Sequence, residues 1–542
     1  MRKKNQMSAS PPEGVTDDDR ITPEILKVAG VVVLGAIMSI LDVTVVNVAL
    51  PTFQTELSTD GEPLKYATVA WTATAYMLAL AAVIPLTGWA ADRFGTKRLY
   101  MTAIALFTLG SVLCAAAWNI ESLIAFRVLQ GLGGGMLMPL GMTIMTRAAG
   151  PHRMGRLMAI LGIPMLLGPI LGPIIGGILI DAASWHWVFL INLPIGIIGL
   201  VYAARVLPKD APEPSESLDV IGMLLMSPGL ALLLYGISSI PGEGTAMATK
   251  VIVPTVIGVL LIGAFVVWSF RPKHPLLDLR LLGNRNLRVS LIVMFLFAGA
   301  FFGALLLVPT YFQQVHGESV MMAGILVAPQ GIGAMLTMPI AGSLVDRVPV
   351  GRIVPFGFAG ILIGMFGVAQ STEPSTPYWQ IIAWLFVMGL GMGATMMPIF
   401  TSALKTLTSH EVARGSTLLN VVQQVASASG IAVISVVLTN GMQKGSIIPG
   451  SEALPGVDEG LTPAQLAAAS HTEQGSQLVQ MLGVSPAQLQ AGFSDLAHAF
   501  EQSYWVAFAV LLVTLIPVAF LPRKSEPVKL LDDQGHPPVV MH

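Results

Sequence analysis

The sequence predicts an all-α integral membrane protein with fourteen transmembrane helices, and three observations lead to this prediction. Of the 542 residues, 54% are hydrophobic and only 11% are charged, whereas soluble domains carry about 25% charged residues. Fourteen separate runs are apolar over the roughly 20 residues that a helix needs to cross a bilayer. Finally, the Lys and Arg residues alternate between the connecting segments, as the positive-inside rule requires.

The predicted spans follow one another through most of the chain. They cover residues 26–51, 66–87, 98–118, 121–146, 153–180, 186–206, 219–240, 250–270, 286–311, 319–344, 352–370, 379–404, 413–438 and 499–521. With both termini inside, 25 basic residues fall in inner segments and 3 in outer segments, and only Arg127 remains within a span. A wrong number of spans would invert this alternation, so we predict a multi-pass protein of a bacterial-type cytoplasmic membrane.

The segments outside the spans are two tails and one long outer segment. Residues 1–25 and 522–542 are predicted to be cytoplasmic tails. The outer segment 439–498 contains "LTPAQLAAAS" and "VSPAQLQAGF", in which Thr or Ser precedes proline and helix formers. This order is typical of an N-cap followed by the first helical turn. We therefore expect short amphipathic helices on the outer face, with a mobile loop of no function as the alternative.

Two pairs of motifs reveal an internal repeat. "GWAADRFGTKR" follows the second span and "GSLVDRVPVGR" the tenth, so that Gly88 and Asp92 match Gly342 and Asp346 at an offset of 254. "GLGGGMLMP" and "GLGMGATMMP" match at an offset of 258. The repeats predict two parallel six-helix halves, residues 26–206 and 285–521, with an inserted two-helix hairpin within 207–284. Parallel halves with a substrate site between them are typical of one class of secondary transporter.

Five motifs in order carry a family resemblance: "LDVTVVNVALP", "GWAADRFGTKR", "RVLQGLGGG", "GPILGPIIGG" and "WHWVFLINLPIG". With them, the chain resembles the fourteen-helix drug:proton antiporters of the major facilitator superfamily, the EmrB/QacA type, over nearly all of residues 26–521. The resemblance implies the major facilitator fold and proton-driven export of lipophilic compounds by alternating access. We expect lipophilic small molecules, protons and membrane lipids as partners, the proton gradient in place of any cofactor, and a functional monomer.

Asp42 and Arg127 are the only clear charges deep within the spans, at depths that differ by about one helical turn. Opposite charges at membrane depth generally face a cavity and pair with each other. Asp42 can alternate between protonated and ionised forms, whereas Arg127 cannot titrate. The pair is thus the predicted proton-coupling site. The alternatives are a static buried ion pair, or an Asp42 that bonds only to Thr44 or Asn47.

The loop "GWAADRFGTKR" is predicted to act as a conformational latch. Its acid can pair with cations at neighbouring helix ends, and its bases can reach helix carbonyl ends or lipid phosphates. In the resembled family this loop latches the cytoplasmic side in the outward-facing state; the alternative is a basic turn that only sets topology. The family pattern has arginine where Thr96 stands, and Pro349 and Val350 alter the second copy, whose latch we expect to be weaker. The candidate latch residues are Gly88, Asp92, Arg93, Gly95, Lys97, Arg98, Asp346 and Arg347.

The fifth span carries small residues at four-residue spacing, which permits close helix packing, beside prolines that loosen the helix. The residues of this motif are Gly168, Pro169, Gly172, Pro173, Gly176 and Gly177. The resemblance identifies it as the antiporter motif at the interface between the halves. An ordinary packing or dimerisation face is the alternative.

Polar and aromatic residues within the spans are candidates to line a substrate cavity, because aromatic walls with a few hydrogen-bonding groups suit lipophilic ligands. They are Asn47, Trp71, Tyr76, Gln130, Gln330, Asn420 and Gln424. For each of them, ordinary packing between helices is an equally good interpretation.

Several other functions are disfavoured by the sequence. The chain has one cysteine, Cys114, which excludes an intrachain disulfide and a cysteine metal cluster. Nucleic-acid binding has no support, and no nucleophile–base pair or phosphate-binding loop indicates an enzyme; we predict no catalytic residues and no metal site. A dedicated exporter of one metabolite, antibiotic, siderophore or lipid, or a sensor without transport, remain as alternatives to drug efflux.

Overall fold

The computed structural model describes residues 22–58, 64, 66–149, 153–209, 217–243, 245, 247–443, 448, 451, 461–471 and 473–524. Every regular element in these ranges is helical. Most of the two predicted tails, before residue 22 and after residue 524, lies outside the described residues. So do most of residues 444–460, within the predicted outer segment.

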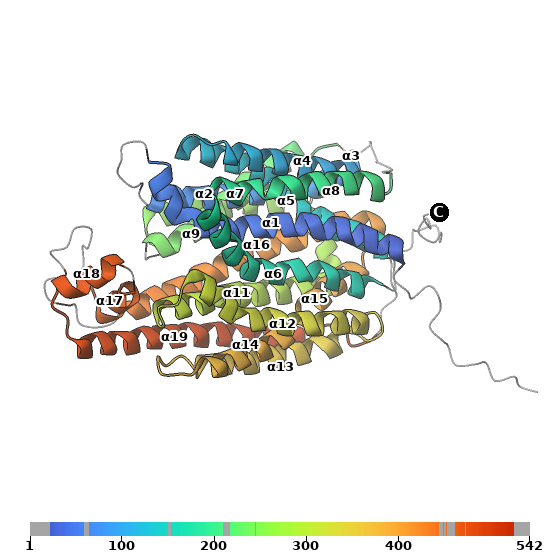
Figure 1. Ribbon diagram of the computed structural model, residues 1–542. Helices are drawn as coiled ribbons and strands as arrows, with labels where there is room; N and C mark the ends of the chain where they lie inside the picture. The colour runs from blue at the N-terminus through green and yellow to red at the C-terminus, as the bar shows by residue number, and fades with distance from the viewer. Residues whose placement is uncertain are drawn as a thin grey trace, which may run out of the picture.

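The helices are arranged in two groups joined by a hairpin. The first group is α1 (Pro23–Glu56), α2 (Tyr66–Val83), α3 (Leu86–Phe94), α4 (Thr96–Ala115), α5 (Ile120–Ala149), α6 (Met154–Ala182), α7 (His186–Leu190) and α8 (Asn192–Val206). The hairpin consists of α9 (Val220–Glu243) and α10 (Thr249–Trp268), followed by the short 3-10 helix η2 (Leu279–Gly283). The second group is α11 (Arg285–Gln314), α12 (Val320–Val345), α13 (Val350–Ala369), α14 (Tyr378–Gly393), α15 (Met396–Lys405), α16 (Ser409–Met442), α17 (Pro463–Ala469), α18 (Glu473–Met481) and α19 (Pro486–Val518). In Figure 1 most of the first group lies above the second.

The helix lengths agree with the predicted spans. Among the described residues, 12 helical segments are long and apolar enough to cross a membrane, and the bent pair α2 and α3 raises the number to 13. The remaining predicted span, 153–180, coincides with α6, which has 29 residues. The fold is therefore compatible with fourteen spans, and the chain is an all-helical multi-pass membrane protein.

Three of the predicted spans differ from single straight helices. The second breaks between Val83 and Leu86, where α2 and α3 are bent by 56°, and Pro85 at this point lacks the N–H that would continue the helix. The sixth divides at Ile191 into α7 and α8, and the twelfth divides before Met396 into α14 and α15. Hydropathy alone does not predict such breaks, because the residues at each break are as apolar as their neighbours.

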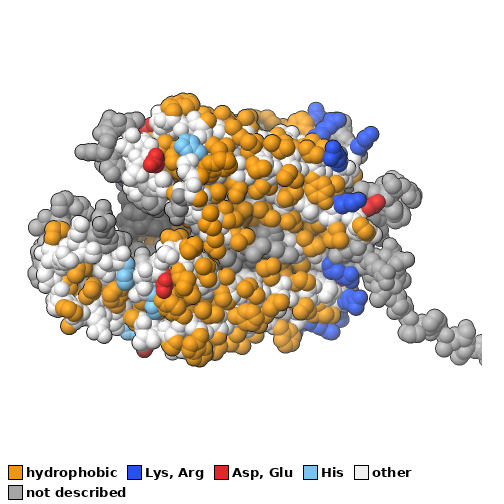
Figure 2. Space-filling model, in the orientation of Figure 1, with side chains coloured by type: hydrophobic (Ala, Val, Ile, Leu, Met, Phe, Trp, Pro, Cys, Tyr) orange, Lys and Arg blue, Asp and Glu red, His pale blue; other side chains and the backbone are white. Residues whose placement is uncertain are grey.

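The surface of the bundle separates an apolar belt from one basic end. Figure 2 shows Lys and Arg side chains gathered at the right, beyond a wide belt of hydrophobic side chains. We call this the basic end: it contains the α3–α4 and α12–α13 turns, with Arg98 and Arg347. Leu260, Ile340 and Phe356 in the belt are 65–80% exposed, as suits side chains that face lipid. The opposite, outer end carries α17 and α18 (Figure 1).

The internal repeat is visible as repeated backbone contacts. The glycine-rich stretch of α5 packs closely on α2 and α4, and that of α14 packs closely on α12 and α13. The matching contacts are Gly133–Phe107 with Gly391–Ile361, Gly135–Leu80 with Gly393–Ala334, and Gly131–Tyr76 with Gly389–Gln330. Each residue of the second half follows its counterpart by 254 or 258 positions, the same offsets as the sequence motifs. The glycines are needed because the neighbouring backbones leave no room for a side chain.

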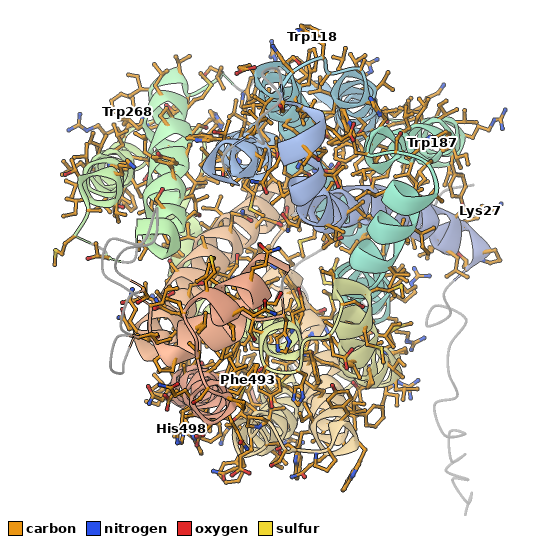
Figure 3. The ribbon with its side chains drawn as sticks, turned by 60° about the vertical axis from the view of Figure 1, so that its left-hand side comes forward. Lys27, Trp118, Trp187, Trp268, Phe493 and His498 are labelled. Atoms are coloured by element: carbon orange, nitrogen blue, oxygen red, sulfur yellow. The ribbon has the colours of Figure 1, made fainter. Side chains whose placement is uncertain are left out.

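The inserted hairpin covers a seam between the halves. Its first helix, α9, lies against α2 of the first half and α16 of the second. Trp71 of α2 stacks on Tyr235 of α9, with ring centroids 5.5 Å apart. Asp219 joins the two ends of the hairpin, because its carboxylate accepts hydrogen bonds from Trp268 Nε1 at 2.9 Å and Leu276 N at 3.2 Å. Figure 3 shows Trp268 at the edge of the bundle.

The outer segment confirms one part of its prediction and corrects another. The hydroxyls of Thr462 and Ser485 accept hydrogen bonds from the backbone of Gln465 and Gln488, each at 3.3 Å, so both Pro-Ala-Gln-Leu motifs do begin helices. The expectation of short helices is wrong for the second motif. Its helix, α19, continues for 33 residues into the last span, with Gly492, Asp495 and Glu501 all inside the helix.

We predict that Gly133→Ala destabilises the protein. The added Cβ would lie 2.5 Å from Phe107 N and 2.8 Å from Ala103 O, so α4 would have to move. Overpacking of this kind costs about 1–3 kcal/mol. The free energy of unfolding, followed by tryptophan fluorescence in detergent, should fall accordingly. The matched control is Gly263→Ala in α10, where a Cβ would meet nothing within 4 Å; equal stability of the two variants would contradict the packing argument.

Candidate functional site

Asp42 on α1 and Arg127 on α5 form an ion pair inside the first half. Arg127 Nη1 lies 2.5 Å from Asp42 Oδ2, and each residue is only 1% exposed. The two charges are therefore partners, as expected, and their role in proton coupling stays a prediction. The expectation that they face a cavity is wrong for this conformation, because helices of the first half enclose them completely. Such enclosure supplies the polar partners that hydrocarbon could not.

Gln130, one turn after Arg127, connects the two charges. Its Nε2 donates to Asp42 Oδ1 and to Ser111 Oγ, both at 2.6 Å. Its Oε1 accepts from Arg127 Nη1 at 2.7 Å. Gln130 thus donates a hydrogen bond to the anion and accepts one from the cation, and in this way it holds both at fixed positions.

Arg127 is surrounded on its other sides as well. Its Nε donates to the Thr72 carbonyl at 3.0 Å. The guanidinium carbon lies 4.1 Å from the centroid of the Tyr76 ring and 5.8 Å from that of Phe189, within the range of cation–π attraction. Tyr76 and Gln130, both predicted as candidates for the substrate cavity, are 0% exposed. The structure thus places them in the charge cluster and not on an open surface.

Sequence analysis missed two members of this cluster, Ser111 on α4 and Asn192 at the start of α8. Asn192 Nδ2 lies 3.3 Å from both Asp42 Oδ1 and Ser111 Oγ. Both residues are almost fully buried. Asn192 is a polar residue within the apolar run of the fifth motif, "WHWVFLINLPIG". This position could have identified it as a candidate partner of the charges. Ser111 gave no such signal, because serine is common within transmembrane helices.

The Asp42 carboxylate is not hydrogen-bonded to Thr44 or Asn47 of its own helix. The Thr44 hydroxyl donates to the carbonyls of Ile40 and Leu41, at 3.1 and 3.0 Å. Asn47 lies with its side chain exposed. Both residues were alternatives as partners of Asp42, and neither one is bonded to it.

The second half keeps the backbone contacts but not the charges. At the offset of 258, Arg127 and Gln130 correspond to Leu385 and Met388. The close contact of Gly172 with Thr44 corresponds to that of Gly430 with Gly299. Since Thr44 then corresponds to Gly299, Asp42, two residues before Thr44, corresponds to Phe297. All three counterparts are buried and apolar. The polar cluster is therefore a property of the first half alone.

Three glycines of the predicted antiporter motif face α1 of the first half. Cβ atoms on Gly168 and Gly172 would collide with Ile40 and Thr44 of α1, on either side of Asp42. Gly176 faces Val45, whereas Gly177 has open space. Nearer the start of α6, Gly155 and Gly162 face α12 of the second half. The side chains of Pro169 and Pro173 lie outside the described residues.

The first latch motif joins α3 to the second half at the basic end. Asp92 Oδ2 lies 3.8 Å from Arg414 of α16, and Asp92 Oδ1 lies 3.7 Å from Arg147 of α5. Gly88, one turn earlier, lies against Ala413 of the same helix α16. The expected pairing of Asp92 with cations at neighbouring helix ends is thus present.

The remaining residues of the first latch motif lie in and next to the turn that follows Asp92. Gly95 has φ +91°, which other residues rarely adopt. The Thr96 hydroxyl, at the position where the resembled family has arginine, accepts from Arg147 at 2.8 Å. Lys97 donates to the carbonyls of Ala204 and Leu207 at the end of α8, at 2.8 and 2.6 Å. Arg93 and Arg98 lie at the end of α3 and the start of α4.

The second copy of the motif makes the equivalent contacts. Asp346 Oδ2 lies 3.8 Å from Arg156 of α6, and Oδ1 accepts from Gly155 N at 2.9 Å. Gly155 and Arg156 correspond to Ala413 and Arg414 at the offset of 258. Burial raises the pKa of the Asp346 carboxyl, while the two backbone N–H groups, Lys405 and Arg156 oppose this effect. The Asp346–Arg156 distance equals the Asp92–Arg414 distance, 3.8 Å. The two distances therefore give no sign of the weaker latch that Pro349 and Val350 led us to expect.

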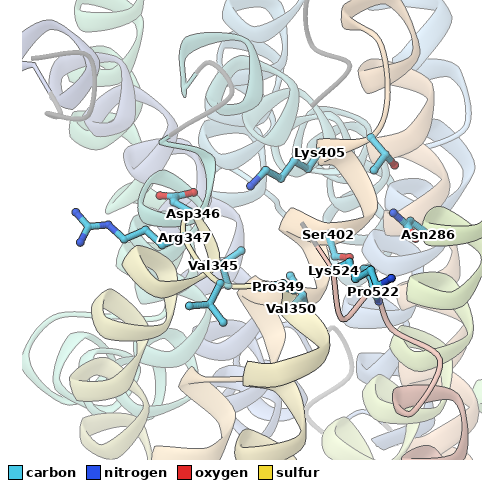
Figure 4. Close-up of a pocket in the computed structure, with 12 residues that line it drawn as sticks. Asn286, Val345, Asp346, Arg347, Pro349, Val350, Ser402, Lys405, Pro522 and Lys524 are labelled. Atoms are coloured by element: carbon cyan, nitrogen blue, oxygen red, sulfur yellow. The ribbon is translucent and has the colours of Figure 1, made fainter. Parts of the chain in front are cut away.

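A small pocket of about 50 Å³ adjoins this second latch. Figure 4 shows Lys405 extending toward Asp346, with Ser402 among the helices and Arg347 at the margin. The residues that line the pocket all belong to the second half and the segment after it.

Closure between the halves is shown by other contacts: the Asp92–Arg414 and Asp346–Arg156 pairs cross between them. In addition, Ser416 of α16 is 0% exposed, and its hydroxyl lies 3.0 Å from that of Thr143 of α5.

The remaining candidates for the substrate cavity are spread over both halves. Trp71 is 40% exposed beside α9. Asn420 and Gln424 are half-buried on α16, and Asn420 Nδ2 donates to Ser416 O at 2.8 Å. Gln330 is buried between α12 and α14, where its Nε2 lies 3.2 Å from Met392 Sδ. The structure does not bring these residues together into one described pocket.

Two parallel helical halves, joined at one end by equivalent ion pairs, are the architecture of one class of secondary transporter. The sequence profile of the Major Facilitator Superfamily matches residues 32–431. The chain belongs to this superfamily.

Known relatives agree with this assignment. The multidrug resistance protein B homolog of Mycobacterium tuberculosis (strain ATCC 25618 / H37Rv) is 47% identical over 513 residues, 94% of this chain and 92% of that protein. The multidrug export protein EmrB of Escherichia coli (strain K12) is 29% identical, over 75% of this chain and 79% of its own length. Among solved structures, the proton:xylose symporter XylE shares the fold with a TM-score of 0.56 at 16% identity, over 92% of this chain and 96% of that one.

We predict that Arg127→Met destabilises the protein more than the double variant Asp42→Asn/Arg127→Met. The single variant leaves the Asp42 carboxylate buried without its cation, which costs about 3–5 kcal/mol. Neutralising Asp42 as well removes the unpaired charge and should recover part of this loss. The measurement is thermal unfolding in detergent, with exposed Arg98→Met as the control. A double variant as unstable as the single one would contradict this view of the pair.

We predict that the double variant Asp92→Asn/Asp346→Asn opens the basic end. Partly buried ion pairs contribute up to about 1 kcal/mol each, so losing both should raise the open population on the order of tenfold. The readout is the rate at which a maleimide labels a cysteine introduced as Ser416→Cys, at a buried position that contacts Thr143 of the first half. The only native cysteine, Cys114, is buried and should contribute little background. An unchanged rate relative to Ser416→Cys alone would show that these pairs do not hold the end closed.

Proposed function

We propose that the protein is a proton-driven efflux antiporter that exports lipophilic drugs or toxic compounds by alternating access. The basic end faces the cytoplasm, as the positive-inside rule favours, and both chain ends lie on that side of the cytoplasmic membrane. The closed latches then correspond to an outward-facing conformation. The single observation that carries the proposal is the enclosed pair of one titratable and one permanently charged residue, Asp42 and Arg127.

The enclosure of Asp42 supports a coupling role. A carboxylate that is 1% exposed can exchange a proton only when the surrounding helices move. Protonation and conformation therefore depend on each other, as two states with different proton affinities require. Arg127 remains charged in both states and keeps Asp42 in place. A static ion pair would need none of this, and the apolar counterparts in the second half favour the coupling role.

The substrate range is proposed from the relatives and from the membrane-depth residues. The two relatives above are named for multidrug resistance and multidrug export. Asn47, Trp71, Asn420 and Gln424 keep exposed or half-buried side chains at membrane depth, and we assign them to the path of lipophilic substrates. Gln330 would join them only after a rearrangement of α12 and α14. The protein acts by transport, without a cofactor, and its residues 26–206 and 285–521 act as the two moving bodies of a monomer.

The test is substrate-induced proton movement in proteoliposomes. With ethidium as the probe, the wild type should release protons on substrate addition and concentrate ethidium when a proton gradient is imposed. Asp42→Asn should abolish both, because the side chain no longer titrates. Its elution in size-exclusion chromatography should match the wild type. Coupled transport by a folded Asp42→Asn variant would overturn the proton role of this site.

A panel of unrelated dyes in a drug-hypersensitive host separates broad from dedicated export. Resistance to several dyes that disappears in Asp42→Asn is the expected result. Resistance to none of them, with the protein present in the membrane, would favour export of a single product over multidrug efflux.

A further inference from the structure

Three hydrogen-bond donors hold the Asp42 carboxylate. Oδ2 accepts from Arg127 at 2.5 Å, and Oδ1 accepts from Gln130 at 2.6 Å and from Asn192 at 3.3 Å. Gln130 and Asn192 also share the Ser111 hydroxyl as a second acceptor. This pattern suits an ionised carboxylate, which accepts hydrogen bonds and donates none.

Protonation of Asp42 removes the negative charge that attracts all three donors, so each of these hydrogen bonds becomes weaker. Arg127 stays charged in both states, and Gln130 is held by a bond of only 2.6 Å. The bond from Asn192 is 0.7 Å longer than that from Gln130, and longer hydrogen bonds are weaker. Asn192 is thus the contact that protonation releases.

Asn192 begins a helix that ends at the first latch. From Asn192 to Ala204, α8 spans about 18 Å. Gly196 of α8 is in close contact with Thr108 of α4, and α8 also packs along α1. At its far end the carbonyls of Ala204 and Leu207 accept hydrogen bonds from Lys97. A closely packed helix of this length moves as one piece, so a change at Asn192 displaces the acceptors of Lys97.

Lys97 in turn adjoins the contacts that close the basic end. Its neighbour Thr96 accepts from Arg147 at 2.8 Å, Arg147 lies 3.7 Å from Asp92, and Asp92 lies 3.8 Å from Arg414 of the second half. A continuous series of polar contacts and one rigid helix thus connects the carboxylate at membrane depth with the latch.

We infer that Asn192 is a positioning residue through which protonation of Asp42 reaches the latch, with α8 as the connecting element and Lys97 at its far end. This inference rests on the proposed proton-coupling function. Asn192 does not itself exchange the proton. It senses whether Asp42 Oδ1 can accept a hydrogen bond, and its release frees α8 from α1 and α4 at the outer end of that helix.

The test measures latch opening directly and needs no knowledge of the substrate. The full-length protein carries Ser416→Cys, a buried position between the halves, and its maleimide labelling rate is compared at pH 8 and pH 5.5. It also carries Asp346→Asn, because burial raises the pKa of the Asp346 carboxyl and this latch residue could respond to acid by itself. At each pH, this labelling rate is divided by the rate of the same cysteine in the Asp92→Asn/Asp346→Asn variant. The division corrects for the effect of pH on the reactivity of the thiol. Acid should raise this ratio in the parent protein, because protonation of Asp42 favours opening.

The variants are chosen to remove one contact each. Asn192→Leu removes both amide donors at similar volume, and Lys97→Met removes the ammonium at similar length. Each should reduce the acid-induced rise by roughly fivefold or more, the lower range of coupling between two sites, and the double variant should lose no more than either alone. Asn192→Gln keeps an amide and should retain most of the rise. Thr108→Val, in the same α4–α8 contact but without a bond to Asp42, is the matched control.

The outcomes separate the inference from the proposed function. If Asp42→Asn abolishes the acid-induced rise but Asn192→Leu keeps it, the inference is wrong and the proton role of Asp42 stands. If Asp42→Asn keeps the rise, the proposed function itself fails. Additive losses in Asn192→Leu/Lys97→Met would exclude α8 as the shared connection. If Asn192→Leu does not elute as a folded protein, Asn192→Ser, whose hydroxyl is too short to reach Asp42, must show the same loss of the rise.

Discussion

The burial of the Arg127 guanidinium is the constraint on which the first half depends. A guanidinium stays charged inside a protein, so at this depth every side of it requires a partner. The partners come from separate helices: Asp42 from α1, the Thr72 carbonyl from α2 and the Phe189 ring from α7. The glycine-rich stretch of α5 lets the backbone of α2 approach closely, with Gly131 and Gly135 against Tyr76 and Leu80. The glycine packing therefore helps to place the Thr72 carbonyl and the Tyr76 ring beside Arg127.

The second half shows that this arrangement does not need the charges in order to fold. Phe297, Leu385 and Met388 occupy the positions of Asp42, Arg127 and Gln130, and the backbone contacts around them are the same. A buried ion pair often contributes no more stability than an apolar replacement of similar size, and here one chain contains both versions. The ion pair is therefore not needed for this packing, which agrees with the proposed role of Asp42 and Arg127 in proton coupling.

The sequence predicts the membrane class, the spans and the repeat, because hydrophobic length, basic residues and glycine spacing are local properties. It also predicts Asp42, Arg127 and the Asp92 and Asp346 pairs, because a charge within or next to a span has few possible partners. It does not predict Asn192 or Ser111, since a short polar side chain in a helix is as easily satisfied by its own backbone. The cavity assignment of Tyr76 and Gln130 fails for a related reason: the periodicity of a helix shows that a residue is inside but not whether it faces a space or another helix.

The symmetry of the latches and the asymmetry of the charges together restrict how the protein can work. Two equivalent ion pairs close the basic end, Asp92–Arg414 and Asp346–Arg156, whereas among the described residues only the first half has a carboxylate deep within a span. Under the proposed proton coupling, this single group would act on both latches. Its helix α1 packs on α6 at Ile40 and Thr44, and the first turn of α6 supplies the partners of Asp346. The other neighbour of Asp42, α8, ends at Lys97 beside the Asp92 latch. Because α1 touches both α6 and α8 around Asp42, a shift of this one helix can loosen both latches at once, and a second acid in the other half is unnecessary.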